Sequence, residues 1–513
     1  MRRSVLRNFI LRNSKRKLHR TLNRASLPTL LTLVALTCGC TLGPRYQKPA
    51  ATAPTTTVPI AWKTQPPWQE ATPKDAIPKG EWWKVFHDSE LDAYETQLME
   101  ANQSLLASRD RLEQARSIAR IATSNFFPQV STDVDALRQG AGANRPLNGA
   151  VVPTSFTQNV FTVPFNISYE VDLFGRVRKN VEAANASLQS SAADLQNVQL
   201  VLTAELAADY YSLRELDAEF QVVEESVGYE RRGLELVNHR HDQGIASGLE
   251  VAQQAALLDA TLTQVALVKQ SRAQYEHAIA VLVGKAASSF SIPSTPLLSA
   301  PPPLPLGVPS DVLERRPDIA TAERQITYAN AQVGIARAAF YPKITLGGNG
   351  GWQSRELTTL ASVPSLFWGL GADALEPLFE GGRNRANLAA ARSAYDASVA
   401  NYRQSVLTAF QQVEDGLSNL QTLSQASTTQ AAAVDEARRE LAIANNRYVG
   451  GIATYLDVIT AQSTLLSNER LASQLLGQQM VSSVYLIKAL GGGWQASELN
   501  QQQVHPRANQ ILA

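Results

Sequence analysis

An internal repeat constrains the fold of this chain more than any other feature of its sequence. Three short segments recur in the same order in both halves: Phe127-Pro128 as Tyr341-Pro342, Leu173-Phe174 as Leu378-Phe379, and Gly244-Ile245-Ala246 as Gly451-Ile452-Ala453. Such self-similarity predicts two copies of one structural unit. We place repeat 1 at residues 81–292 and repeat 2 at residues 311–495. A Pro-rich linker at 293–310 joins them, and a polar C-terminal tail follows at 496–513.

Each copy contains the hydrophobic spacing of a very long helix. Apolar residues recur every three or four positions from Val181 to Val227, and again from Leu388 to Leu420. This is the pattern of amphipathic and coiled-coil helices. One helix over residues 181–243 would reach about 95 Å at ~1.5 Å per residue. Each half is therefore expected to contain a helix, two strands, a very long helix, a turn and a helix, in an elongated molecule.

Segments with the two-residue period of β-strands lie between these helices. Apolar and polar side chains alternate from Phe161 to Val171, and again from Trp368 to Ala374. Their expected partners begin after Pro128 and Pro342 and run about ten residues, near the length that crosses a bilayer. A half-buried sheet of a soluble protein shows the same alternation. Four strands cannot close a membrane barrel and lipid does not tolerate open edges, so membrane strands require an oligomer.

The N-terminus has the three-part layout of an export signal. Residues 1–39 combine a basic segment, the apolar run 30–36 and small residues that end at Gly39. The apolar run is shorter than the roughly 20 residues of a transmembrane helix, so residues 1–39 are predicted to be a removable signal peptide. Cys40 stands where a lipoprotein signal would be cleaved, and ordinary cleavage nearby is the alternative. Residues 40–80, rich in Pro and Thr, are expected to form an extended tether.

Composition and motif spacing exclude several other functions. The 47 Lys and Arg residues nearly balance 46 Asp and Glu residues, and the body lacks the clustered positive charge of a nucleic-acid-binding protein. Cys38 and Cys40 are the two cysteines, so the body holds no disulfide framework. His239 and His241 point to different helix faces. Gly347–Gly351 lacks the Lys-Ser/Thr of a phosphate loop and is expected at a strand end. We therefore predict no enzyme, with no catalytic, metal-binding or cofactor-binding residue.

Three longer segments carry a specific family resemblance: Trp82–Leu91 (WWKVFHDSEL), Leu313–Glu323 (LERRPDIATAE) and Pro377–Arg383 (PLFEGGR). Over residues 40–495 the chain resembles the outer-membrane factor family of tripartite efflux systems, in its lipoprotein (NodT-type, TolC-like) branch. The resemblance implies a mainly α fold with a transmembrane β-barrel portion. Three chains with four strands each would close a twelve-stranded barrel in the outer membrane, and a long α-helical barrel would extend into the periplasm.

The resemblance also implies the function and the partners. The expected function is a passive exit duct that receives drugs or other small toxic solutes from an inner-membrane RND pump and a periplasmic adaptor, the membrane fusion protein. Residues from Cys40 to Pro49 resemble the start of mature efflux lipoproteins, so N-acyl and S-diacylglycerol groups are expected on Cys40 and no other cofactor. The channel of a type I protein secretion system and a periplasmic coiled-coil lipoprotein are the alternatives.

The same resemblance places a periplasmic aperture at the turns between paired helices. By similarity Glu250 and Asp457 form acidic rings there. In a trimer each carboxylate would occur three times around a narrow pore, which raises its pKa and disfavours anions. Capping of a helix N-terminus is an alternative role of both acids, and it is compatible with the first.

Three further residues belong to the expected aperture. Tyr448 matches an aromatic residue of the constriction, and Arg240 and Arg447 would tether the closed state through ion pairs. Ala453 and Thr460 stand where related secretion channels carry a basic and a second acidic residue. A different closing network is therefore expected in this chain.

The stretch from Leu313 to Asp318 is assigned a structural role. Pro317 suits the first turn of a helix, and Asp318 and Glu323 suit its positive end. No chemistry is predicted for this stretch.

We predict that Cys40→Ala abolishes acylation while the trimer still forms, because the diacylglycerol is expected on the Cys40 thiol and acylation of the amino group is expected on this same modified cysteine. Incorporation of radiolabelled palmitate and the migration of the unheated protein measure the two properties. Label in the variant would refute the assignment of Cys40.

Overall fold

The computed structural model describes residues 43–52, 58, 62, 80–143, 146–147, 150–151, 155–297, 299–302 and 315–493. The predicted signal peptide at 1–39, Cys40, most of the tether, linker residues 303–310 and the tail at 496–513 lie outside the described residues.

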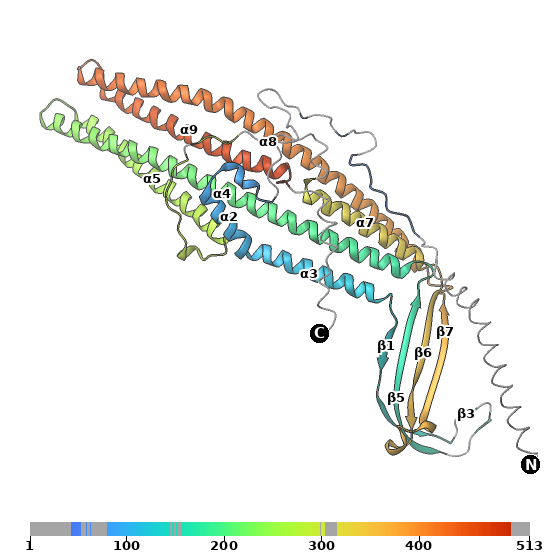
Figure 1. The fold of residues 1–513 in the computed structure, drawn as a ribbon. Coiled ribbons are helices and arrows are strands. Elements are labelled where there is room, and N and C mark those ends of the chain that lie inside the picture. The colour runs from blue at the N-terminus through green and yellow to red at the C-terminus, as the bar shows by residue number, and fades with distance from the viewer. Residues whose placement is uncertain are drawn as a thin grey trace, which may run out of the picture. The chain divides into compact units, whose positions relative to one another are not determined.

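Three helices of each half match in order and in length (Figure 1). Their bounds are α2 (Ser89–Ala101), α3 (Gln103–Ser124), α4 (Arg176–Asp242) and α5 (Gly248–Leu282), then α7 (Pro317–Ala338), α8 (Arg383–Val449) and α9 (Tyr455–Ala489). The helices α4 and α8 each have 67 residues, α5 and α9 each have 35, and α3 and α7 each have 22. Equal lengths in the same order are what two copies of one structural unit give, and the bounds of the two repeats stay a prediction. None of the described helices is both long and apolar enough to cross a bilayer.

In the described part of the chain four short 3₁₀ helices accompany these elements: η1 (Trp82–Phe86), η2 (Ala287–Ser289), η3 (Leu357–Thr359) and η4 (Val363–Ser365).

The chain forms two compact units, and each draws on both sequence halves. One unit comprises residues 1–48, 115–188 and 325–399 and contains the main sheet. The other comprises residues 49–114, 189–324 and 400–513 and contains α5, α9 and most of α4 and α8. The units do not follow the repeats because strands of both sequence halves join in the main sheet.

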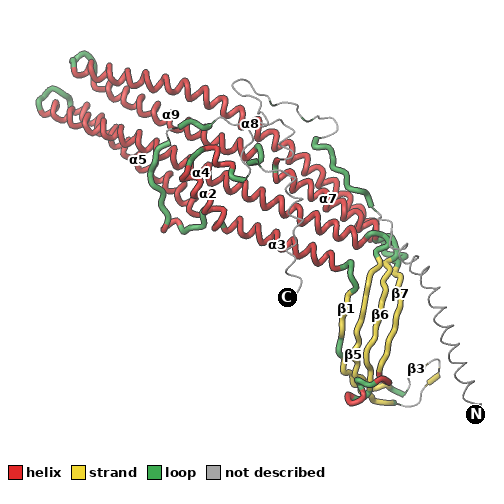
Figure 2. Tube along the Cα trace, viewed as in Figure 1, coloured by secondary structure: helices red, strands yellow, loops and turns green. Residues whose placement is uncertain are grey.

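The main sheet is antiparallel, in the order β1-β5-β6-β7 (Figure 2). Its strands are β1 (Gln129–Thr132), β2 (Asp135–Ala141), β5 (Phe156–Val171), β6 (Lys343–Ser354) and β7 (Leu366–Leu375). The expected first strand is divided at Asp133-Val134 into β1 and β2, and both segments pair with β5. A separate two-stranded sheet joins β3 (Pro146–Leu147) to β4 (Ala150–Val151).

The strand register keeps the apolar and polar side chains on opposite faces. Phe165 pairs with Gly350, which pairs with Trp368, while on the other face Asn166 pairs with Asn349. The alternation read from the sequence is confirmed. Gly347–Gly351 lies inside β6, so its predicted place at a strand end was wrong. A Cβ at Gly351 would clash with the Val163 carbonyl oxygen, so glycine is needed where β5 approaches closely.

The stretch before α7 joins three helices. The helix begins at Pro317 with Asp318 in its first turn, as predicted. The buried Arg316 guanidinium donates to Asp318 at 2.7 Å, to Gln412 Oε1 of α8 at 2.8 Å, and to the Ala489 carbonyl at 3.0 Å. Arg316 therefore satisfies a C-terminal carbonyl of α9 that the helix itself leaves free.

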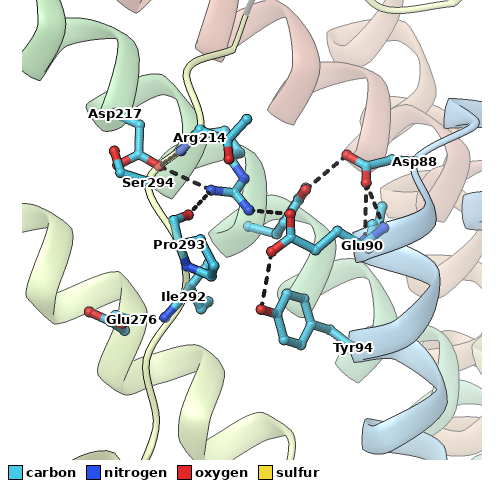
Figure 3. Close-up of polar contacts among 12 residues, drawn as sticks. Asp88, Glu90, Tyr94, Arg214, Asp217, Glu276, Ile292, Pro293 and Ser294 are labelled. Atoms are coloured by element: carbon cyan, nitrogen blue, oxygen red, sulfur yellow. Dashed lines mark hydrogen bonds and ion pairs between the residues drawn. The ribbon is translucent and has the colours of Figure 1, made fainter.

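A buried ionic network pins the segment after α5 onto α4 (Figure 3). The side chain of Asp217 is fully buried and accepts from Arg214 at 3.1 Å and from Arg272 at 2.7 Å. It also accepts from the Ser294 hydroxyl at 2.8 Å and from the Thr295 amide at 3.0 Å. These bonds compensate the desolvation of the charges, so the network is structural.

Glu95 of α2 is buried without compensation. It has 0% relative exposure, and neither carboxyl oxygen has a hydrogen-bond partner within the described part of the chain. Burial raises the pKa of Glu95 well above its usual value, and the charge of Asp92 raises it further. The carboxyl group is therefore uncharged in the fold at acidic pH and destabilises the fold once it must ionise.

We predict that Glu95→Gln raises the unfolding midpoint at pH 8 by a few degrees, on the order expected for a change of 1 to 2 kcal/mol. The pKa of Glu95 is higher in the folded protein than in the unfolded chain, where it is about 4.3. The stability that the protonated carboxyl contributes is therefore fully present below the unfolded pKa and is lost as the pH rises through the folded pKa. The gain from glutamine should therefore shrink toward pH 4.5. Thermal unfolding in detergent at both pH values measures it, with Glu100→Gln, an exposed residue of the same helix, as the control. An equal shift at both pH values would contradict the buried-acid account.

Candidate functional site

The two hairpin turns at the ends of α4 and α8 have the same local structure. Gly244 has φ +73° and Gly451 has φ +70°, a conformation that favours glycine. The Ile245 amide donates to the Arg240 carbonyl at 2.8 Å, and the Ile452 amide donates to the Arg447 carbonyl at 2.9 Å. These bonds satisfy the last carbonyls of both long helices. The repeated Gly-Ile-Ala segments therefore mark two equivalent helix ends.

Both predicted aperture acids cap the helix that follows. The Glu250 carboxylate accepts from the backbone amide and the hydroxyl of Ser247, each at 3.3 Å. The Asp457 carboxylate accepts from the backbone amide of Thr454 at 3.0 Å and from its hydroxyl at 3.1 Å. The capping interpretation is confirmed for both residues. Their role in a pore stays a prediction.

One of these acids also joins the two sequence halves. The Tyr448 hydroxyl at the end of α8 donates to Glu250 Oε2 at 3.0 Å. Burial raises the pKa of Tyr448, and the hydrogen bond to Glu250 adds to that shift. Tyr448 therefore stays a neutral donor at physiological pH. The structure brings together Glu250 and Tyr448, whereas the exposed Asp457 bonds to its own cap residue.

The two predicted gate arginines have different surroundings. The Arg240 guanidinium lies 4.6 Å from the centre of the Tyr448 ring, in cation–π geometry. Arg240 thus contacts the ring of Tyr448 within the same chain. Arg447 is exposed. Ion pairing of the two arginines in a closed state stays a prediction.

Two further candidate residues, Tyr455 and Gln254, were not predicted from the sequence. Tyr455, the first residue of α9, packs on Tyr448 with ring centres 4.9 Å apart, and its hydroxyl donates to Gln254 Oε1 at 2.9 Å. Gln254 belongs to α5 and has 0% relative exposure. The sequence signal that could have indicated Gln254 is a polar residue on the buried stripe of α5, one turn beyond Glu250. An apolar cluster surrounds the aromatic pair: Val237, Ala246, Ala444, Val458 and Ala461.

A second contact between the hairpins lies farther along the same helices. Arg470 of α9 pairs with Glu219 of α4 at 2.5 Å and donates to Gln264 of α5 at 3.1 Å. Gln474 also donates to Glu219, at 3.3 Å. The side chain of Glu219 is 5% exposed, so this ion pair is shielded from water.

A polar groove of about 630 Å³ lies among α4, α5, α8 and α9. Its lining residues are Ser212, Glu215, Tyr275, Asn419, Thr422, Leu423, Gln474, Gly477, Gln478, Val481, Ser482 and Tyr485. Burial and the nearby Glu219 together raise the pKa of Glu215 to about 7. The lining includes no histidine, lysine or cysteine. Within the described residues, no group of three or more His, Cys, Asp or Glu side chains has the arrangement of a metal site.

The chain matches the sequence model of the outer membrane efflux proteins at residues 96–285 and again at residues 308–492. It is 32% identical over 424 residues to the pyoverdine export outer membrane protein OpmQ of Pseudomonas aeruginosa, covering 82% of this chain and 89% of OpmQ. It is also 32% identical over 469 residues to the solvent efflux pump outer membrane protein SrpC of Pseudomonas putida, covering 90% of this chain and 97% of SrpC.

A solved structure has the same fold over its whole length. The outer-membrane channel OprN superposes on this chain with a TM-score of 0.81 and 27% sequence identity. The match covers 89% of this chain and 100% of OprN.

Proposed function

This chain belongs to the outer membrane efflux protein family, and from that membership we propose that it is the outer-membrane exit duct of a tripartite RND-type efflux system. It conducts drugs or other small toxic solutes passively across the outer membrane. The observation that carries this proposal is the antiparallel sheet with one apolar and one polar face, held in one chain with paired helical hairpins.

The free edges of the sheet support a homotrimer. In the described chain β7 is paired on one side, with β6, and the first strand position is paired on one side, with β5. Lipid does not satisfy the backbone groups of an open edge. Three copies with four strand positions each close a barrel of twelve strands, which is wide enough for a water-filled lumen.

The two faces of the sheet support its orientation in that barrel. Trp368 and Leu370 of β7 lie on the apolar face and are exposed in the single chain. On the opposite face Asn166, Asn349 and Asp373 lie beside exposed strand glycines. The apolar face contacts lipid and the polar face lines the lumen, as in outer-membrane barrels.

The duct has no chemistry of its own. The outer membrane efflux proteins form a family of ducts and not of enzymes. The energy for transport comes from an inner-membrane RND pump, and a periplasmic adaptor opens the tips of the hairpins. We propose further that Cys40 is acylated and anchors the mature N-terminus in the outer membrane. OpmQ and SrpC are named for different solutes, so one duct architecture serves several substrates.

We predict that Glu250→Ala combined with Asp457→Ala raises the single-channel conductance and weakens blockade by multivalent cations. Both substitutions remove carboxylates from the narrowest part of the pore, where they bind cations and repel anions. Planar-bilayer recordings of the purified protein measure both properties. The loss of two helix caps costs about 1 kcal/mol each, so Ser247→Ala with Thr454→Ala is the control. It removes hydroxyls of the caps and leaves both carboxylates.

Two outcomes would count against the proposal. A purified wild-type protein that forms no conducting trimer would refute the exit duct. Equal conductance in the double carboxylate variant and the wild type would leave the acids with their capping role alone.

We also predict that the protein captures an RND pump and its adaptor from cells. In-cell crosslinking, affinity purification through the C-terminal tail and mass spectrometry identify the partners. Recovery of an ABC transporter instead would move the function to type I protein secretion, and recovery of neither would favour a periplasmic structural role.

A further inference from the structure

We propose that Tyr455 and Gln254 form a buried latch that joins the two hairpins and positions Tyr448 for its hydrogen bond to Glu250. The inference rests on the proposed function, because the latch would hold the aperture of the duct closed. It adds two residues to those that family resemblance assigns to the aperture.

The latch connects three helices through one hydrogen-bonded chain. The Tyr455 hydroxyl of α9 donates to Gln254 Oε1 of α5 at 2.9 Å. Gln254 Nε2 then donates to the backbone carbonyl of Glu230 in α4, also at 2.9 Å. Tyr455 is 3% exposed and Gln254 is 0% exposed. Water does not compete for these hydrogen bonds, and the loss of either bond would leave a buried polar group without a partner.

A glycine in α4 makes room for the latch. A Cβ at Gly233 would lie 3.0 Å from the Tyr455 hydroxyl and 3.1 Å from Gln254 Nε2. Both distances are tighter than ordinary side-chain contacts. Glycine inside a helix is less favourable than alanine, and here it permits a close approach of two side chains to the α4 backbone. The surface of α4 therefore has a notch that receives the polar ends of Tyr455 and Gln254.

The latch is not a duplicated feature of the repeat. When the two hairpin turns are matched at Gly244 and Gly451, the position equivalent to Tyr455 is Gly248 and the position equivalent to Gln254 is Ala461. The helix caps and the arginines at the turns occur in both copies, whereas Gly248 and Ala461, the equivalents of the latch pair, have no side chain that could form this hydrogen bond. A contact that each hairpin needed for its own folding would be expected in both copies. This contact instead links one hairpin to the other.

The latch acts on the aperture through Tyr448. The Tyr455 ring lies 4.9 Å from the Tyr448 ring at an interplanar angle of 57°, and Arg240 lies against Tyr448 at 4.6 Å. The Tyr448 hydroxyl is then directed to Glu250, in the first turn of α5. Separation of α8 and α9 from α4 and α5 must break both hydrogen bonds. Tyr455 and Gln254 are therefore positioning residues of the closed tip.

The test compares variants that keep the packing and remove the hydrogen bond. Tyr455→Phe removes the hydroxyl, and Gln254→Met removes the amide, both its oxygen and its nitrogen, at nearly the same volume. Each should raise the occupancy of the open state in planar-bilayer recordings about fivefold, the effect of one lost buried hydrogen bond. The double variant should raise the open-state occupancy little more than the stronger single variant does, because both changes break the same hydrogen bond. Gln430→Met is the matched control, since Gln430 of α8 bonds to Asn468 of α9 within one hairpin.

A double-mutant cycle distinguishes positioning from general destabilisation. Tyr448→Phe removes the bond to Glu250, so Tyr455→Phe should change gating less in that background than in the wild type. The unfolding midpoint of Tyr455→Phe should match that of Gln430→Met. Hydrogen exchange of the segments 244–257 and 448–462 should be faster in the latch variants and unchanged in Gln430→Met.

Each outcome bears on one claim. Wild-type gating and exchange in both Tyr455→Phe and Gln254→Met would overturn the latch, as would an equal gating effect of Gln430→Met. A protein that carries no current would overturn the exit duct, while faster exchange confined to the latch variants would still support the contact between hairpins.

Discussion

The antiparallel pairing of β5 with β6 is the interaction on which the rest of the structure depends. It matches Phe161–Val171 with Ile344–Ser354 and so joins the two sequence copies into one sheet. The helix α4 begins soon after β5 and α7 ends shortly before β6. The antiparallel pairing therefore brings the start of α4 and the end of α7 to the same end of the sheet. A slip of one residue would turn every apolar side chain to the polar face. The register thus sets which surface meets lipid and which meets water in the proposed barrel.

The two copies have kept the same backbone at their hairpin turns and differ in the side chains there. Both turns place a glycine at positive φ and an acid in a cap. The position equivalent to Tyr448 is His241, whose Nδ1 lies 2.9 Å from the Ala246 carbonyl oxygen of its own turn. One copy therefore presents an aromatic hydroxyl to the other, while the second copy stabilises its own turn. Duplication supplies the scaffold, and this asymmetry supplies the contact between hairpins.

The same carboxylate can serve folding and function because its two oxygens face different partners. Glu250 Oε1 accepts from Ser247 in the cap, and Glu250 Oε2 accepts from Tyr448 of the other hairpin. The capping role was predictable from the spacing of Ser247 and Glu250 alone, since it depends on residues three apart. For Tyr448 the sequence predicted only that it lies at the same aperture as Glu250, and it predicted no hydrogen bond between them. Its geometry depends on how two hairpins distant in sequence pack.

The sequence by itself determined the repeat, the long helices, the strand alternation, the helix caps and the glycine turns. Each of these follows from local periodicity or from residues a few positions apart, where backbone geometry leaves few choices. The tertiary structure alone decided that Gly347–Gly351 lies within a strand, that Arg316 caps α9, and that Tyr455 meets Gln254 in the notch at Gly233. These contacts join residues far apart in the chain, and their partners are chosen by the packing of whole helices and strands, which no local pattern encodes.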